Sequence, residues 1–455
     1  MANFSSDQLD AVFKAYDIRG TYDDQINEAL AWAIGNAFVV VTDADALVIG
    51  YDMRPSSPSL ASAFADGAAC AGADVTLIGL ASTDELYFAS GLMERPGAMF
   101  TASHNPAQYN GIKLCRALAA PVGMETGLAE IKDLVARSEV KTHSLKGAIT
   151  EVDVLEAYAD FLLSLAPVSG RRLKVVVDAG NGMAGLTAPA VLGKLDLDVT
   201  EMYYELDGTF PNHEANPIEP ANLVDLQAKV RQVGADIGLA FDGDADRCFL
   251  VDQVGELVSP SVLTALIAVR ELRKEPGAAI IHNLITSKGV AEIVAEHGGK
   301  PVRTRVGHSF IKAKMAETGA IFGGEHSGHF YFRDFWRADS GMRAALHALA
   351  ALAQSEQTLS EVLQPYQRHV SSGEINSRVS DQDAVLAQIK DRYHDAEGVT
   401  VDELDGLSVI AADWWFNVRA SNTEPLLRLN VEGKDTATME QVRDEALTII
   451  GGERA

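Results

Sequence analysis

Short apolar runs, each followed by a polar turn and then a helical pattern, recur along most of the chain. Residues 46–50, 173–178 and 278–282 are such runs, and apolar side chains at helical spacing follow each of them. Strands that alternate with helices of roughly ten to fifteen residues are typical of α/β proteins with parallel or mixed sheets. The sequence therefore predicts repeated α/β units of similar design, although no fixed residue period connects them.

The C-terminal part of the chain has a different pattern. Strand-like runs at residues 407–410, 414–418 and 426–431 follow one another directly and precede a closing helical pattern. Neighbouring strands without helices between them predict an antiparallel sheet in an α+β domain. A chain of 455 residues is also too long for a single core, so we expect three or four domains.

Composition narrows the class of protein. Hydrophobic residues make up 47% of the chain and charged residues 22%, as in soluble globular proteins. No apolar run reaches the roughly 18 to 20 residues of a membrane span, and the first residues do not resemble a signal peptide. Three widely spaced cysteines, Cys70, Cys115 and Cys248, suit neither a disulfide framework nor a zinc site. We therefore expect a cytoplasmic protein with no membrane partner.

The net charge of −26 bears on the remaining partners. A strongly acidic chain repels nucleic acid, so we expect no nucleic-acid partner. An anionic substrate could bind only where lysine and arginine side chains outweigh this field locally. Basic residues in polar, glycine-rich loops are therefore the first candidates for substrate contacts.

A cluster of three aspartates, Asp242, Asp244 and Asp246, directly follows the apolar run 237–241. Adjacent carboxylates repel one another unless a cation neutralises them, and carboxylate and carbonyl oxygens without interleaved His or Cys suit Mg²⁺. A calcium-binding EF-hand loop is the alternative, but Arg247 and Gln253 stand where that loop needs Gly and Glu. The pattern therefore predicts a Mg²⁺ site rather than a solvated acidic turn.

Ser103 and His104 follow a strand signal at residues 97–100, and Pro106 stiffens the loop behind them. A serine at the exit of a strand, beside a histidine, is well placed to act as an exposed nucleophile. The alternative is that Ser103 or Asn105 only caps a turn. Lys113 lies ten residues downstream of Ser103, where it is a candidate for acid–base catalysis, an anion contact or a solvated charge.

Two further loops carry clustered polar side chains. Residues 323–329 place Glu325, Ser327 and two histidines among glycines, which suits a polyhydroxylated ligand better than zinc, with a structural turn as the alternative. Residues 419–425 place Arg419 beside hydroxyl and amide groups, which is phosphate-binding chemistry, with an ordinary hairpin turn as the alternative.

Together these loops resemble those of the α-D-phosphohexomutase superfamily, and in particular its bacterial phosphomannomutase/phosphoglucomutase group. Four motifs occur in the family's order: the serine loop 101–106, the metal loop 242–247, the sugar loop 324–329 and the phosphate loop 419–423. Tyr16–Gly20, Asp178–Gly182 and Asp207–Asn212 match as well. The resemblance therefore covers essentially the whole chain.

The resemblance implies three similar mixed-sheet α/β domains and a smaller, mobile C-terminal α+β domain, with expected bounds at 1–150, 151–254, 255–366 and 367–455. Ser103 would be a phosphoserine, and Asp242, Asp244 and Asp246 would hold Mg²⁺ that also touches its phosphate. By analogy, the catalytic end is lined by Arg19, His104, Lys113, Arg247 and His329, with Lys113 and His329 as candidates for proton transfer. Substrate contacts would come from Tyr16, Arg305, His308, Glu325, Ser327, Arg419, Ser421, Asn422 and Thr423.

The implied reaction interconverts mannose 6-phosphate and mannose 1-phosphate, or also the glucose phosphates, with a hexose 1,6-bisphosphate as reorienting intermediate and activator. Thr101 and the Tyr16–Gly20 motif favour this group over the amino-sugar mutases. His326 stands where the mannose and glucose enzymes often have Met, and Arg305 stands where a Lys often occurs. Sugar specificity therefore stays open between mannose, glucose and glucosamine. A phosphoglucosamine mutase, a non-catalytic phosphosugar-binding protein and a phosphatase are the alternatives. We expect a monomer or a weak homodimer.

Overall fold

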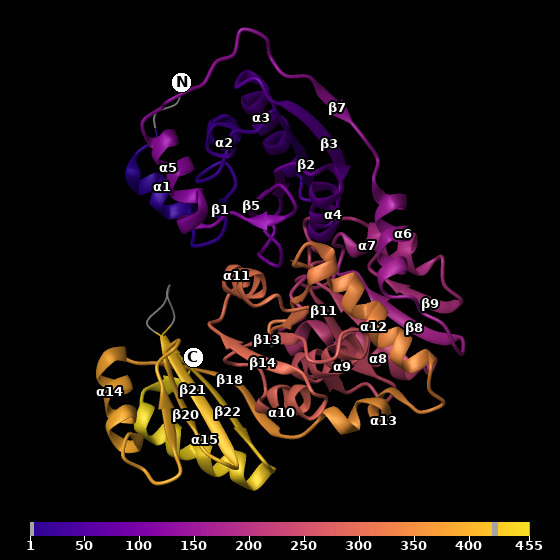
Figure 1. The fold of residues 1–455 in the computed structure, drawn as a ribbon, viewed down its shortest axis with the longest axis vertical. Helices are drawn as coiled ribbons and strands as arrows, with labels where there is room; N and C mark the ends of the chain where they lie inside the picture. Colours follow the sequence, from indigo (N-terminus) through magenta and orange to yellow (C-terminus); the bar gives the residue numbers. More distant parts are fainter. Residues whose placement is uncertain (1–3, 421–425, 455) are drawn as a thin grey trace. The chain divides into compact units, whose positions relative to one another are not determined.

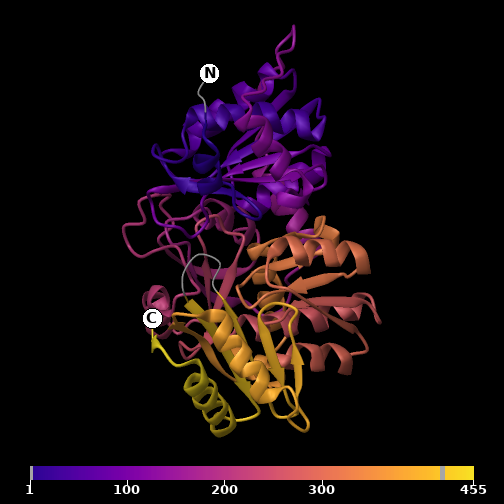
Figure 2. The same cartoon turned by 90° about the vertical axis from the view of Figure 1, so that its left-hand side faces the viewer.

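The computed structural model describes residues 4–420 and 426–454, drawn from two directions in Figures 1 and 2. The chain divides into two compact units. Unit 1 consists of Met1–Leu263 and Ser327–Val362, and unit 2 of Thr264–His326 and Leu363–Ala455. Within the described residues, no helix is both long and apolar enough to cross a membrane.

The first region of unit 1 is built on a seven-stranded mixed sheet. Its strands are β1 (Ile18–Thr21), β2 (Ala46–Tyr51), β3 (Asp74–Leu80), β4 (Gly97–Phe100), β5 (Tyr109–Arg116), β6 (Ala120–Pro121) and β7 (Ile149–Glu151), and its helices are α1 (Ser6–Val12), α2 (Glu28–Thr42), α3 (Ser57–Cys70), α4 (Thr83–Met93), η1 (Met124–Thr126) and α5 (Leu128–Ala136). The strand order is β1-β5-β4-β2-β3-β7, with β6 on β5. Strands β4, β2, β3 and β7 run parallel, whereas β5 is antiparallel to β4 and β1.

The core of this region forms where helices α2 and α3 pack on the sheet. The ring centre of Phe64 in α3 lies 5.9 Å from that of Phe38 in α2 and 5.5 Å from that of Phe100 in β4. All three are fully buried, and apolar residues of the neighbouring strands surround them. This packing fixes the end of β4, from which the Ser103 loop departs.

The second region of unit 1 has a five-stranded mixed sheet in the order β12-β11-β10-β8-β9. Its elements are α6 (Leu155–Leu165), β8 (Leu173–Asp178), α7 (Ala184–Leu192), β9 (Leu197–Met202), η2 (Pro220–Leu223), α8 (Val224–Val233), β10 (Ile237–Phe241), β11 (Cys248–Asp252) and β12 (Leu257–Val258). Strand β10 is parallel to β8 and antiparallel to β11, and Phe241 pairs with Cys248. The aspartate loop is therefore the tight connection between two buried, paired strands.

Unit 1 is completed by a later stretch of the chain. It comprises β16 (Phe330–Phe332), η3 (Arg333–Phe335), β17 (Ala338–Asp339), α12 (Gly341–Ala353) and α13 (Leu359–Leu363). Strands β16 and β17 pair antiparallel, and an isolated bridge joins His329 to Arg247. Helix α9 (Pro260–Lys274) begins in unit 1 and ends in unit 2.

Unit 2 contains parallel strands and a separate antiparallel sheet. The parallel strands lie in the order β14-β13-β15, and the antiparallel sheet in the order β19-β20-β21-β22-β18-β23. The elements are β13 (Ala279–Asn283), α10 (Lys288–Glu296), β14 (Lys300–Thr304), α11 (His308–Thr318), β15 (Phe322–Gly324), η4 (Gln364–Tyr366), β18 (Val370–Arg378), α14 (Gln382–Tyr393), β19 (Thr400–Asp402), β20 (Leu407–Ile410), β21 (Trp414–Ala420), β22 (Leu426–Gly433), α15 (Thr436–Ile450) and β23 (Glu453–Arg454). Helix α15 packs on β22 and β18 of this sheet (Figure 1). The predicted α/β pattern and the antiparallel C-terminal sheet are both confirmed.

Candidate active site

The Ser103 loop connects β4 to β5 and places a serine hydroxyl next to the aspartate loop. Ser103 has a left-handed backbone (φ 52°), which is strained for a residue with a Cβ. Its Oγ donates to Asp242 Oδ2 at 2.8 Å and lies 3.2 Å from His104 Nδ1, while its N–H donates to Thr101 Oγ1 at 2.8 Å. The predicted nucleophile and the predicted metal loop are therefore in direct contact.

Gly243 allows this close approach. A Cβ at position 243 would lie 2.4 Å from the Ser103 carbonyl oxygen, a distance that no side chain tolerates. On the other side, the Gly243 carbonyl accepts the N–H of Met183 at 2.9 Å. Any larger residue at position 243 would push the two loops apart.

The aspartate loop gathers three buried carboxylates. One oxygen from each of Asp242, Asp244 and Asp246 lies within 4.8 Å of the others, and the three residues are at most 1% exposed. Among the described residues, Asp244 Oδ1 and Asp246 Oδ1 have no hydrogen-bond partner. Buried carboxylate oxygens without partners are costly, so the residues fit a hard divalent cation held by carboxylates.

The backbone carbonyls of the same loop, which we expected as possible metal ligands, also accept hydrogen bonds. The Asp244 carbonyl accepts the N–H of Thr83 at 3.0 Å, and the Asp242 carbonyl accepts the N–H of Ala245 at 3.0 Å. These two bonds hold the turn, and each carbonyl oxygen keeps a second lone pair.

Two cations already balance part of this charge. Lys113 Nζ lies 2.6 Å from Asp244 Oδ2 and 2.5 Å from Asp246 Oδ2, and Arg247 Nε donates to Asp242 Oδ2 at 2.9 Å. Burial disfavours the charged form of Lys113, but the charges of Asp244 and Asp246 outweigh burial and raise the pKa of Lys113. Burial likewise disfavours the charged form of Asp244, but Lys113 outweighs it and holds the pKa of Asp244 below its usual range. For Asp242, burial prevails over the attraction of Arg247 and raises the pKa to about 7.

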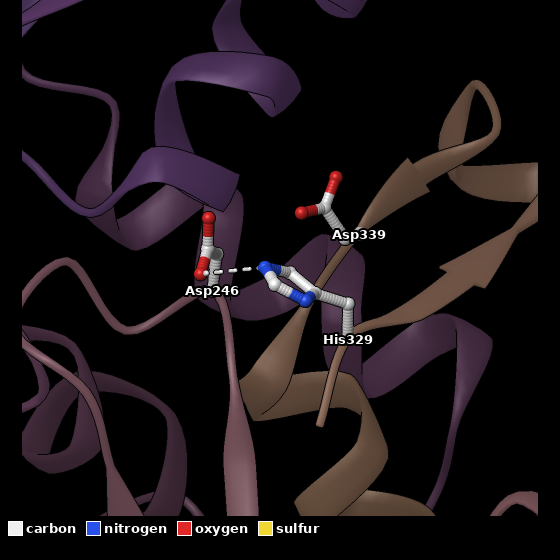
Figure 3. Close-up of side chains that lie close together, drawn as sticks. All are labelled: Asp246, His329 and Asp339. Atoms are coloured by element: carbon white, nitrogen blue, oxygen red, sulfur yellow. Dashed lines mark ion pairs between the residues drawn. The ribbon is translucent and has the colours of Figure 1, made fainter. Parts of the chain in front are cut away.

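His329 lies between two carboxylates, Asp246 and Asp339 (Figure 3). Its Nε2 is 3.7 Å from Asp246 Oδ1, and its Nδ1 is 3.0 Å from Ser327 Oγ. One ligand atom from each of Asp246, His329 and Asp339 lies within 4.8 Å of the others. The ring is about a fifth exposed (22%), so a ligand can reach it. Sequence reasoning missed Asp339, because a single aspartate at the end of a two-residue strand carries no motif.

Arg19 and His104 also lie at the Ser103 loop. Arg19 Nη1 donates to Asn105 Oδ1 at 2.6 Å, and Nη2 donates to Asp17 Oδ2 at 2.6 Å, so the guanidinium lies beside the Ser103 loop. Burial, followed by the positive charges of Arg247 and Arg19, lowers the pKa of His104 well below its usual value. Tyr16 is half-buried and lies just before β1. The structure thus brings together all six predicted catalytic residues of unit 1 around the three aspartates.

Sequence reasoning also missed two buried side chains that hold these loops. Thr83, at the start of α4, donates from Oγ1 to Asp244 Oδ2 at 2.6 Å. Arg54 is fully buried and donates to carbonyls of the Ser103 loop. The sequence offered one signal for Arg54: it stands two residues after Asp52, directly behind an apolar run that predicts a buried strand.

In unit 2, Glu325 is anchored inside its own unit. Its Oε1 accepts from Asn283 Nδ2 at 3.0 Å and from the N–H of Gly307 at 3.3 Å. Neighbouring His326 is half-buried, and desolvation lowers its pKa. The guanidinium of Arg305 lies over the ring of Phe310, 4.9 Å from its centre. These contacts present polar groups on the loops that follow β15 and β14.

Arg419 is the last residue but one of β21. Its Nη2 lies 3.6 Å from Glu374 Oε2, and Arg428 Nη1 lies 3.7 Å from the other oxygen of the same carboxylate. The predicted contacts Ser421, Asn422 and Thr423 lie outside the described residues, as does the side chain of His308 at the start of α11.

The comparisons with known proteins agree with this geometry. The sequence matches all four domains of one family: phosphoglucomutase/phosphomannomutase α/β/α domain I at residues 10–141, domain II at 156–255, domain III at 259–369 and the C-terminal domain at 374–449. The chain belongs to the phosphoglucomutase/phosphomannomutase family. It is therefore a phosphohexomutase, an isomerase of carbohydrate metabolism.

Individual relatives cover nearly the whole chain. It is 40% identical over 439 residues to a protein of Xanthomonas campestris pv. campestris described as phosphohexose mutases, covering 96% of this chain and 98% of that protein. It is 39% identical to a phosphomannomutase of Salmonella montevideo, again covering 96% and 98%. Its fold is similar to the crystal structure of a phosphoglucomutase/phosphomannomutase family protein from Burkholderia thailandensis, with a TM-score of 0.89, 33% identity and coverage of 99% and 100%.

Proposed function

We propose that this phosphohexomutase interconverts mannose 6-phosphate and mannose 1-phosphate, and the glucose phosphates as well, through a phosphoserine at Ser103 and a 1,6-bisphosphate that reorients. The observation that carries the proposal is the 2.8 Å contact between Ser103 Oγ and Asp242, inside a cluster of buried carboxylates balanced by Lys113 and Arg247. Phosphoryl transfer requires positioning and charge neutralisation more than covalent assistance, and this cluster supplies both.

In the first half-reaction, the phosphoryl group leaves Ser103 Oγ for the free hydroxyl oxygen of the bound sugar phosphate. The hydroxyl proton must be accepted, and we assign this role to His329, whose imidazole ring is about a fifth exposed and lies beside the aspartate loop, 3.7 Å from Asp246. Lys113 remains engaged by Asp244 and Asp246 and supplies positive charge. In the second half-reaction, Ser103 Oγ takes the other phosphoryl group of the bisphosphate. The proton held by His329 passes to the sugar oxygen that loses this group.

Asp242, Asp244 and Asp246, with the phosphoserine, would hold Mg²⁺. Bound there, the ion would supply positive charge that neutralises the phosphoryl oxygens. Arg19 and Arg247 add charge at the same end, and His104 orients the Ser103 hydroxyl from 3.2 Å. A phosphoserine carries about −1.5 to −2 charge at neutral pH, so several cations are needed beside an anionic substrate.

For the rest of the substrate we propose Glu325 and Ser327 as contacts to sugar hydroxyls. Arg419, Ser421, Asn422 and Thr423 would bind the phosphate that is not transferred, with Arg305, His308 and Tyr16 as further contacts. We also propose four domains at 1–150, 151–254, 255–366 and 367–455, which the four family matches support. The cytoplasmic location and the monomeric or weakly dimeric state stay predictions.

The test measures isomerisation of mannose 1-phosphate, glucose 1-phosphate and glucosamine 1-phosphate with Mg²⁺ and a catalytic amount of the matching 1,6-bisphosphate. We expect turnover of the mannose and glucose phosphates, and its collapse in Ser103→Ala. The matched control is Ser138→Ala, since Ser138 has the same left-handed backbone (φ 52°). Preference for glucosamine 1-phosphate would overturn the substrate assignment in favour of a phosphoglucosamine mutase. Full activity of Ser103→Ala would overturn the phosphoserine.

A further inference from the structure

Arg54 is a fully buried arginine in the turn between β2 and α3, outside the residues assigned above. Its five N–H donors are all used. Nη2 donates to the carbonyls of Ser103 at 2.9 Å and Asn105 at 2.7 Å, and Nη1 to those of Pro106 and Tyr109 at 2.9 Å each. Nε donates to Asp52 Oδ2 at 3.2 Å. Four of these five bonds therefore go to the backbone of residues 103–109, which comprise Ser103, the rest of its loop and the first residue of β5.

The guanidinium is itself held on several sides. Asp52 Oδ1 accepts the N–H of Arg54 at 3.0 Å and the hydroxyl of Ser57 at 2.6 Å. The ring of Phe210 lies over the guanidinium, with its centre 5.1 Å from Cζ. Next to it, a Cβ on Gly208 would lie 2.6 Å from Arg54 Cα, so this segment is packed directly against the arginine. The position of the guanidinium is thus fixed before any substrate binds.

This arrangement has a consequence for the chemistry at Ser103. A carbonyl oxygen that faced a phosphoryl group would repel it, because both carry negative charge. Arg54 donates to four carbonyl oxygens of residues 103–109, which offsets their partial negative charge next to Ser103. It also holds Ser103 in a left-handed backbone that the residue would not adopt unaided (φ 52°).

We propose that Arg54 is a positioning residue for the phosphoryl-carrying serine: it fixes the conformation of residues 103–109 so that Ser103 Oγ faces the aspartate loop. The inference rests on the proposed function of Ser103. Lysine cannot replace Arg54, because one ammonium group has three donors and lacks the planar fork that reaches carbonyls on two sides. Phosphoryl transfer should therefore depend on the guanidinium even though its N–H groups donate to the backbone of residues 103–109 and to the side chain of Asp52.

The experiment compares Arg54→Lys with Arg343→Lys. Arg343 is a matched control because it is also fully buried in unit 1, where it donates to Asp334 at 2.5 and 2.9 Å and stacks on Phe332. For each variant we would measure kcat and KM for mannose 1-phosphate, the rate at which labelled glucose 1,6-bisphosphate phosphorylates Ser103, and the thermal unfolding temperature.

We expect Arg54→Lys to lower kcat and the phosphorylation rate about 100-fold while KM changes by less than about 3-fold, since the serine is misplaced but the substrate still binds. Arg343→Lys should keep kcat within about 3-fold of the wild type, even if its unfolding temperature falls as much as that of Arg54→Lys. A folded Arg54→Lys with wild-type kcat, or equal kcat losses in both variants, overturns the proposal.

If Arg54→Lys does not fold, Asp52→Asn provides the second variant. It keeps the four carbonyl bonds but removes the charged anchor of Nε, and we expect kcat to fall about 10-fold with KM unchanged. An unchanged kcat in folded Asp52→Asn overturns the proposal. No turnover by the wild type would instead overturn the proposed function, and the role of Arg54 with it, whereas wild-type turnover with an insensitive Arg54 overturns only the positioning role.

Discussion

The two units hold their charged side chains in different ways. In unit 1, buried carboxylates meet cations at hydrogen-bond distance, as Asp244 and Asp246 do with half-buried Lys113 at 2.6 and 2.5 Å. In unit 2, Arg419 and Arg428 share one carboxylate, Glu374, at 3.6 and 3.7 Å. Among the described residues, neither arginine Nε has a hydrogen-bond partner.

This difference suits the two units to different tasks. The contacts in unit 1 fix the groups that we propose to react before any substrate binds, which would favour catalysis because no reorganisation is needed during the reaction. The two guanidiniums in unit 2 exceed the single carboxylate between them, which leaves positive charge and donors for an anion. We therefore expect changes in unit 1 to affect kcat and changes in unit 2 to affect KM.

The largest expected effect is the loss of the cation site in unit 1. Removal of divalent ions with a chelator, or the change Asp244→Asn, should lower turnover about 1000-fold or more, because the phosphoryl charge is no longer neutralised. Mg²⁺ should raise the unfolding temperature of the wild type but not of Asp244→Asn. The control is Asp66→Asn, at an exposed position on α3. Full activity in the presence of the chelator would contradict a cation requirement in unit 1.

A smaller effect of a different kind is expected in unit 2. Arg419→Ala should raise KM for the sugar phosphates about 10- to 100-fold and lower kcat much less, because a planar phosphate contact is lost while the reacting groups stay in place. Steady-state kinetics would measure both constants, with exposed Arg392→Ala as the control from the same unit. A large fall in kcat at constant KM would contradict the division of tasks.

Glu85 tests the cost of buried charge in unit 1. It is 1% exposed, and burial raises its pKa to about 8. The folded state thus favours the protonated carboxyl, so the wild type loses stability as the pH rises from about 4.5 through 8. Glu85→Gln should match the wild type near pH 4.5 and exceed it by about 2 to 4 kcal/mol at pH 9. Urea unfolding at both pH values measures this, with exposed Glu356→Gln as the control. A pH-independent difference would contradict the burial argument.

The smallest expected effect concerns the carboxylate shared by the two arginines. Glu374→Gln removes the charge that competes with a bound anion, and we expect KM for mannose 1-phosphate to fall about 2- to 5-fold with kcat unchanged. Exposed Glu397→Gln, in the same unit, should leave KM unaltered. If KM rose in Glu374→Gln instead, the carboxylate would be orienting the arginines rather than competing with the substrate.

Much of the fold could be predicted from periodicity. Strands β8 and β20 have the predicted bounds, while β21 and β22 each run two residues further than predicted. Apolar runs locate strands well because a buried strand leaves no room for polar residues. Strand order was not predictable, since the neighbours of β10 are β8 and β11, and only pairing across the sheet selects them.

The sequence by itself determined the chemistry: the three aspartates, the serine beside a histidine and the motifs that match the family. Only the tertiary structure decided how these groups are held. Arg54, Thr83 and Asp339 reach the site from segments without a motif, because they act through contacts between residues far apart in the chain. A sequence displays which groups are present, but distances between such groups exist only after the sheets have packed and the loops have met.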